Sequence, residues 1–103
     1  MFHIIVVLAA GERHGYAILR EVEAVSGTRL GPTTLYRSLK QLLEAGLVTE
    51  AGEVGAADQR RRTYRLTAAG TRAGQAETRR LAALVEVARR RRALRSPSPR
   101  GAR

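Results

Sequence analysis

The chain has 103 residues and a mass of 11.2 kDa, which suffices for one small domain and leaves no room for a second core of ordinary size. It contains no cysteine, which excludes disulfide scaffolds, Cys-ligated zinc, iron–sulfur clusters and thiol nucleophiles. Nineteen Lys and Arg against nine Asp and Glu give a net charge of +10. Nucleic acid and anionic membranes are therefore the first partners to consider.

The basic charge is concentrated in the last third of the chain. Residues 68–103 carry ten Arg and two Glu, a net charge of +8, whereas residues 1–30 are neutral. Residues 31–46 and 47–67 each carry a net charge of +1. Specific nucleic-acid binding therefore has to be argued from the residue pattern in the first two thirds and not from the total charge.

An apolar run at the start of the chain predicts a short helix that is buried nearly all round. Its large residues follow one another without polar alternation: Ile4, Ile5, Val7 and Leu8. The run has no Lys or Arg before it and is far shorter than the roughly 18 residues that a membrane span requires. We therefore expect a cytoplasmic protein without a membrane contact.

The second predicted helix covers residues 14–26. Ile18, Val22 and Val25 recur at helical spacing, and Gly27 supplies the stop. These three residues are expected to form the buried face of the helix.

The third helix is predicted to begin at Pro32, since Gly31 is a suitable N-cap and proline is favoured at the first helical position. It extends to residue 45, and Gly46 ends it. At about 100° per residue, four leucines fall on one side: Leu35, Leu39, Leu42 and Leu43. The exposed side carries residue types that contact base edges and phosphates: Thr33, Thr34, Arg37, Lys40 and Gln41.

A two-stranded ribbon is predicted next, with strands over 47–51 and 62–67 and a long tip over 52–61. In the second strand, Tyr64 and Leu66 alternate with Thr63 and Arg65. The tip ends in a basic triplet that would reach the flanking backbone or minor groove of DNA: Arg60, Arg61 and Arg62.

Thr67 is a good N-cap for the last helix, whose apolar residues are spaced as one stripe that no later segment covers: Leu81, Leu84, Val85 and Ala88. We expect this stripe to form a dimer contact together with residues of the first helix: Ile4, Ile5 and Leu8. Residues 96–103 are rich in Ser, Pro and Arg and are predicted to be a disordered basic tail.

The order of these elements predicts a mainly α fold with a two-stranded β-wing, a winged helix-turn-helix. Residues 1–67 would form the DNA-binding domain and residues 68–95 the C-terminal dimerisation helix. The third helix would enter the major groove of double-stranded DNA.

Enzymatic signals are sparse in this sequence. His3 and His14 are not spaced as metal ligands, and His14 is better explained as a residue that caps or packs the second helix. No phosphate-binding loop, nucleophile elbow or G-x-G-x-x-G occurs. We therefore expect no enzyme, no metal and no cofactor.

Several motifs resemble the PadR family of bacterial transcriptional regulators. They are His14-Gly15-Tyr16-Ala17-Ile18, Gly31-Pro32-Thr33-Thr34-Leu35-Tyr36, Gly46-Leu47-Val48 and the segment from Arg60 to Gly70. Their order and spacing cover most of the chain. Thr33 departs from the glycine that is common in the family.

The resemblance implies a homodimer that binds an inverted repeat in promoter DNA, usually as a repressor. It places Thr34 and Tyr36 at the start of the recognition helix against phosphate or bases, and Tyr64 in the wing. The single C-terminal helix resembles the smaller subtype. Some relatives release DNA on binding phenolic acids or hydrophobic drugs, but this chain has no Trp to stack a flat drug at the dimer centre.

Two other functions remain open from the sequence. The chain would also suit a winged-helix protein-interaction module with only non-specific DNA affinity. A small enzyme with a borrowed cofactor ranks third.

Overall fold

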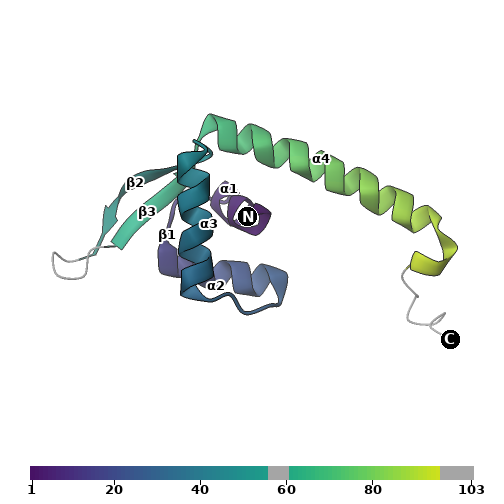
Figure 1. Ribbon diagram of the computed structural model, residues 1–103, viewed down its shortest axis with the longest axis horizontal. Coiled ribbons are helices and arrows are strands. Elements are labelled where there is room, and N and C mark those ends of the chain that lie inside the picture. Colours follow the sequence, from purple (N-terminus) through teal and green to yellow (C-terminus); the bar gives the residue numbers. More distant parts are fainter. Residues whose placement is uncertain (56–60, 96–103) are drawn as a thin grey trace.

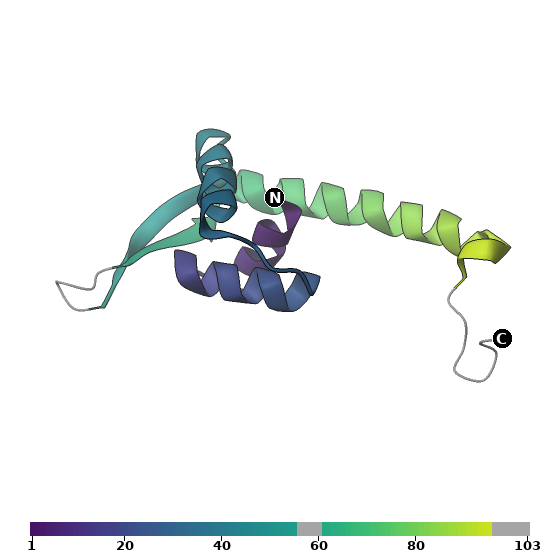
Figure 2. The same ribbon diagram turned by 60° about the horizontal axis from the view of Figure 1, so that its bottom comes forward.

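Four α-helices and three short strands make up the fold of the computed structural model, which describes residues 1–55 and 61–95. In chain order they are α1 (Phe2–Ala9), β1 (Arg13–His14), α2 (Gly15–Ser26), α3 (Pro32–Glu44), β2 (Val48–Val54), β3 (Arg61–Leu66) and α4 (Ala68–Arg90), followed by a 3-10 turn (Arg92–Leu94). The first three helices and the sheet pack together as a head, and α4 extends away from it (Figures 1 and 2). The mainly α fold with a β-wing is confirmed.

The sheet has one strand more than the predicted ribbon. Its order is β1-β3-β2, with both pairs antiparallel, and Arg13 and His14 of β1 pair with Tyr64 and Thr63 of β3. A two-residue strand has no alternation that a sequence pattern could detect. The extra pairing ties the wing to the turn between α1 and α2.

The core lies between α1, α2, α3 and the sheet. Its most completely buried side chains are Ile18, Leu35, Leu39 and Leu42, each 1% exposed or less. The leucine stripe of the third helix is therefore confirmed. The expectation for Val25 was wrong, since this residue is 59% exposed near the C-terminal end of α2, so that only Ile18 and Val22 of the predicted stripe are buried.

The helix ends follow the local sequence signals. His14 Nδ1 accepts a hydrogen bond from the backbone N–H of Ala17 at 3.2 Å, which confirms its role as the cap of α2. Gly27 ends that helix in the left-handed conformation, with a φ of 70°. Gly31 is the N-cap of α3 and Pro32 its first residue, as predicted.

A compact joint connects the start of α4 to the end of α3. The Thr67 hydroxyl donates to the Gly46 carbonyl at 2.6 Å and accepts from the Gly70 N–H at 3.0 Å. The Thr67 N–H donates to the Leu47 carbonyl at 3.1 Å. A Cβ at Gly70 would overlap that same carbonyl oxygen, so glycine permits the close approach.

Further along α4, Gly74 packs against α1, where an added Cβ would lie 2.8 Å from Ile5 Cγ2. The first turns of α4 are thus fixed to the head through both α3 and α1.

Candidate nucleic-acid interface

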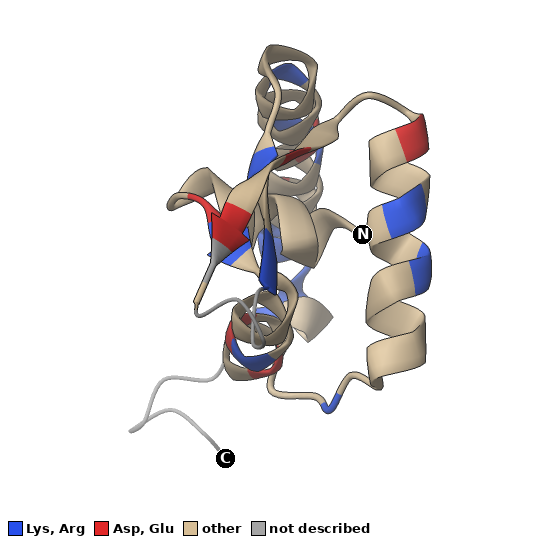
Figure 3. Ribbon diagram, turned by 90° about the vertical axis from the view of Figure 1, so that its left-hand side faces the viewer, with Lys and Arg blue, Asp and Glu red and all other residues tan. Residues whose placement is uncertain are grey.

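Helix α3 stands at the edge of the head, with one side against the core and the other uncovered (Figure 3). All five of its predicted contact residues are exposed: Thr33, Thr34, Arg37, Lys40 and Gln41. Within the described parts of the chain, neither Arg37 nor Lys40 forms an ion pair. This polar surface therefore keeps its hydrogen-bonding and charge capacity for a ligand.

The wing carries exposed arginines where β3 begins. Arg61 and Arg62 are both exposed, and Arg62 Nη1 lies 3.4 Å from Glu50 Oε1 on β2. Because both partners of this pair are largely solvated, it contributes about 1 kcal/mol at most. The predicted contact Arg60 lies outside the described residues.

The two predicted tyrosines meet at one pocket. Tyr36 of α3 and Tyr64 of β3 line a pocket of about 460 Å³ together with Gly15, Tyr16, Arg61 and Arg62. Tyr64 is 7% exposed, so it forms part of the pocket wall rather than an open wing surface. Burial raises the pKa of Tyr64, and the nearby carboxylate of Glu50 raises it further, which keeps the hydroxyl protonated.

Tyr16 and Arg20 were not among the predicted contact residues. Arg20 Nη1 donates to Tyr16 Oη at 3.0 Å, and its guanidinium carbon lies 5.7 Å from the centre of the Tyr16 ring. Arg61 of the wing lies 5.9 Å from the same ring. The spacing of four residues puts Tyr16 and Arg20 on the same side of one helix, so the sequence alone could have indicated their contact. The approach of Arg61 to Tyr16 depends on tertiary contacts, which no local pattern shows.

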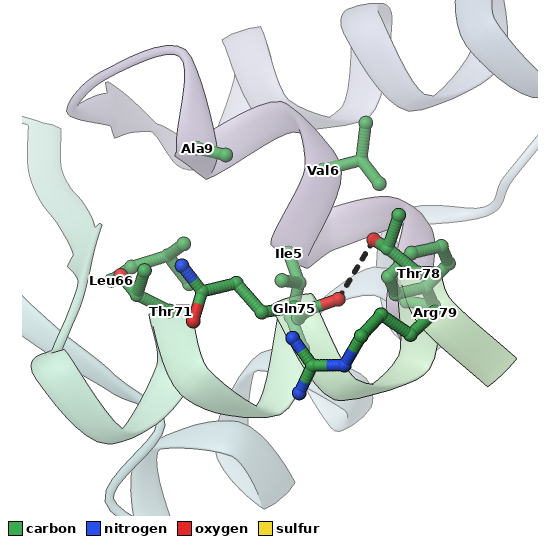
Figure 4. Close-up of a pocket in the computed structure, with 10 residues that line it drawn as sticks. Ile5, Val6, Ala9, Leu66, Thr71, Gln75, Thr78 and Arg79 are labelled. Carbon is green, nitrogen blue, oxygen red and sulfur yellow. Dashed lines mark hydrogen bonds between the residues drawn. The ribbon is translucent and has the colours of Figure 1, made fainter.

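A second, more apolar pocket lies between α1 and the first half of α4 (Figure 4). Its volume is about 430 Å³. In the close-up, Ile5, Val6 and Ala9 of α1 face Thr71, Gln75 and Thr78 of α4.

The predicted dimer residues fall into two groups. Ile4, Ile5 and Leu8 are at most 8% exposed and belong to the core of the single chain. On α4, Leu81 and Ala88 are half-buried, and Leu84 and Val85 are 56% and 49% exposed. Two further apolar residues near this end of α4, Val87 and Leu94, are also exposed. Apolar surface available to a partner is therefore concentrated in the second half of α4 and the turn after it.

Two other kinds of site are absent from residues 1–55 and 61–95. No group of three His, Asp or Glu side chains there could hold a metal ion. None of the helices found there combines the length and the apolar character that crossing a membrane requires.

The three-helix head, the hairpin wing and the exposed α3 define a winged-helix protein of the transcriptional-regulator class. The sequence model of the transcriptional regulator PadR-like family matches residues 4–76. The chain therefore belongs to the PadR-like family.

Solved structures of related fold agree with this assignment. A PadR family regulator from Clostridium difficile R20291 superposes with a TM-score of 0.77 at 22% identity, over 86% of this chain and 93% of that one. Bacillus subtilis PadR in complex with operator DNA gives a TM-score of 0.68 at 23% identity, over 75% of this chain and 44% of that one. RosR of H. salinarum is 30% identical, with a TM-score of 0.67 and coverage of 80% and 71%.

One curated relative matches part of the chain. It is a 37.1 kDa protein in transposon TN4556 of Streptomyces fradiae, 45% identical over 67 residues. The match covers 65% of this chain and 18% of the length of that protein.

Proposed function

We propose that this chain is a dimeric transcriptional regulator that inserts α3 into the major groove of its operator. The observation that carries the proposal is the polar side of α3, which the chain's own packing leaves uncovered and whose Arg37 and Lys40 have no acidic partner in the described residues. A major groove about 12 Å wide admits an α-helix of about 10–12 Å diameter.

The chemistry of this surface suits both base edges and phosphates. Arg37 can donate two hydrogen bonds to guanine, and Gln41 can bind adenine in the same bidentate way. The start of α3 has no side-chain cap, which leaves backbone N–H groups for a phosphate. On the wing, Arg61 and Arg62 would contact the flanking backbone.

Dimerisation through α4 would supply the second copy of this surface. Leu84 and Val85 expose apolar area that a partner helix would bury, and the pocket between α1 and α4 would receive part of that helix. Residues 1–67 would then bind DNA and residues 68–95 would join the two copies. A two-fold dimer fits an inverted repeat in the operator. A dimer that covers a promoter would act as a repressor, and such a protein would work in the cytoplasm.

If the chain binds a small hydrophobic or phenolic effector, we propose the apolar pocket between α1 and α4 as its site. The volume of that pocket lies within the range of about 300–1,000 Å³ that is typical of small-molecule sites. An effector there would compete with or rearrange the dimer contact.

The test is a comparison of a duplex selected from a random pool with a shuffled duplex of the same composition. Arg37→Ala should weaken binding to the selected duplex by about 1–3 kcal/mol and reduce the preference over the shuffled one. Arg72→Ala, which removes an exposed arginine from the first half of α4, is the matched control and should leave that preference unchanged. If wild type shows no preference for any selected duplex, the proposal is wrong.

The alternative is a protein-interaction module with only non-specific DNA affinity, and the exposed apolar residues of α4 favour it. This alternative predicts equal affinity for all duplexes and a steep loss of binding between low and physiological salt. Sequence preference that persists at physiological salt would exclude it.

A further inference from the structure

The turn between α2 and α3 (Figure 1) is held by side chains from the last turn of α2. Ser26 Oγ accepts a hydrogen bond from the Thr28 N–H at 3.2 Å and donates to the Thr28 carbonyl at 3.3 Å. Further along, Glu23 Oε2 accepts from the Leu30 N–H at 2.9 Å. Leu30 directly precedes Gly31, the N-cap of α3. The Glu23 contact therefore ties the start of the proposed recognition helix to the helix before it.

Local charge effects do not explain a glutamate at position 23. The last turn of α2 contains no basic side chain, and the C-terminal end of a helix dipole disfavours a negative charge. Glu23 is half-buried and forms no ion pair in the part of the chain that the structure describes. Arg20, one turn earlier, donates its hydrogen bond to Tyr16. The contact with Leu30 gives the Glu23 carboxylate a structural role that charge pairing does not.

This contact holds α3 without blocking its N-terminus. Among the described residues, no side chain caps the start of α3, and its first turn contains no acidic residue. Because Leu30 lies before the N-cap, its bond to Glu23 leaves the N–H groups of the first helical turn free for a ligand. A capping side chain at residue 31 would instead occupy one of those groups. The helix start is therefore fixed while its donors stay available.

The Leu30 side chain supplies a weaker constraint of another kind. It is half-buried and packs against the core, but apolar contacts are non-directional. A hydrogen bond depends on angle as well as distance, so it sets the course of the backbone. At the next residue the chain has open space, since a Cβ at Gly31 would meet no atom within 4 Å. Glu23 thus provides a directional constraint at the point where α3 begins.

We propose that Glu23 is a positioning residue for DNA recognition. Its carboxylate holds the Leu30 N–H, and with it the first turn of α3, in the orientation in which the polar side of that helix fits the major groove. The proposal rests on the proposed function. It adds a residue that does not touch DNA and that acts on sequence preference through α3. Non-specific binding depends on positive charge and does not require this orientation.

Two substitutions at position 23 separate the hydrogen bond from the charge. Glu23→Ala removes both, whereas Glu23→Gln keeps an acceptor oxygen on a side chain of the same length. Loss of the charge should strengthen binding to selected and shuffled duplexes equally, so the ratio of the two affinities reports positioning. Glu23→Ala should lower this ratio about tenfold, the factor expected for a hydrogen bond to a carboxylate. Glu23→Gln should lower it about threefold or less, because a neutral acceptor retains about half of that free energy.

Glu21→Ala is the matched control. Glu21 lies on the same helix and is also half-buried, but its carboxylate pairs with Arg13 of β1 at 2.9 Å. Its removal should leave the affinity ratio unchanged. The proposal is wrong if Glu23→Ala discriminates between the duplexes as well as wild type does. Equal losses for Glu23→Ala and Glu23→Gln would also overturn it, because charge alone would then account for the effect.

Amide hydrogen exchange tests the contact in the absence of DNA. In wild type, the Leu30 N–H should exchange at least about tenfold more slowly than in an unfolded peptide. Glu23→Ala should remove this protection and leave that of core residues such as Leu39 unchanged. An unprotected Leu30 N–H in wild type would overturn the proposal even if Glu23→Ala did not fold.

A local cap separates positioning from helix initiation. Gly31→Ser adds a hydroxyl at the N-cap, where the φ of −73° suits any residue and space is open. Combined with Glu23→Ala, it should stabilise the start of α3 without restoring the affinity ratio, because it does not tie α3 to α2. Recovery of the wild-type ratio in this double variant would mean that Glu23 only supports helix formation.

The role of Glu23 and the proposed function can fail separately. If wild type prefers no duplex, the proposed function is wrong, and the role of Glu23 in DNA recognition is wrong with it. If wild type prefers the selected duplex and Glu23→Ala prefers it equally, only the role of Glu23 is wrong.

Discussion

Helices α3 and α4 have similar apolar spacing but very different surroundings. In α3, Leu35, Leu39 and Leu42 are each 1% exposed, and the uncovered side of the helix is polar. In the second half of α4, Leu84 and Val85 are about half exposed. Helical periodicity therefore predicted both helices. It did not show which of the two apolar stripes is buried within the single chain and which is left exposed.

This difference gives the two helices different roles. A helix whose apolar side is covered by its own chain can present its polar side rigidly to a ligand. A helix with an uncovered apolar side gains free energy from a partner, at roughly 25 cal/mol for each Å² of apolar surface removed from water. Figures 1 and 2 show α4 extending from the head, where a second copy could reach it.

The largest expected effect comes from a substitution in the buried leucine stripe of α3. Leu39→Ala should lower the free energy of unfolding by about 2–5 kcal/mol, because it leaves a cavity in the core. Leu84→Ala is the matched control on α4 and should change it by about 0.5 kcal/mol or less where the chain is monomeric. Urea denaturation measures both. If both variants lost the same free energy of unfolding, Leu84 would have to be buried within the single chain.

The next effect concerns the uncovered stripe. Leu84→Glu should weaken self-association by at least about tenfold, or about 1.4 kcal/mol, because a carboxylate would replace an apolar side chain in the contact. Ala83→Glu places the same charge on the side of α4 away from this stripe and should leave association unchanged. Sedimentation equilibrium distinguishes them. Identical association constants for both variants would place the dimer contact elsewhere.

The smallest effect concerns the joint between the two helices. Thr67→Ala removes the cap of α4 and the hydrogen bond to Gly46, so stability should fall by about 1 kcal/mol. Thr71→Ala, at an exposed position one turn further on, should cost about 0.5 kcal/mol or less. A thermal melt of each variant checks the difference, and no difference would show that Thr67 does not support the joint.

Much of the fold followed from local signals in the sequence. The leucine stripe of α3, the Gly31-Pro32 start and the Thr67 cap were all predicted and are confirmed. Each depends on residues within one or two helical turns, where spacing determines geometry. Val25 was wrongly expected in the core because periodicity does not show where the neighbouring elements end.

The candidate site was less accessible to sequence reasoning. The exposed residues of α3 followed from periodicity, whereas the pocket around Tyr16 joins three elements that are distant in the chain. Strand β1 is too short to carry a pattern, yet it helps to hold the wing beside α2. Tertiary contacts of this kind appear only in the folded structure.

Hydroxyl-radical footprinting on a selected duplex shows whether two copies of α3 occupy successive major grooves. We expect two protected half-sites about 10 base pairs apart, or a multiple of that spacing, on one face of the duplex. Arg37→Ala should weaken both. Uniform protection without a preferred sequence, or a pattern that Arg37→Ala leaves unchanged, would show that α3 does not bind DNA in this way.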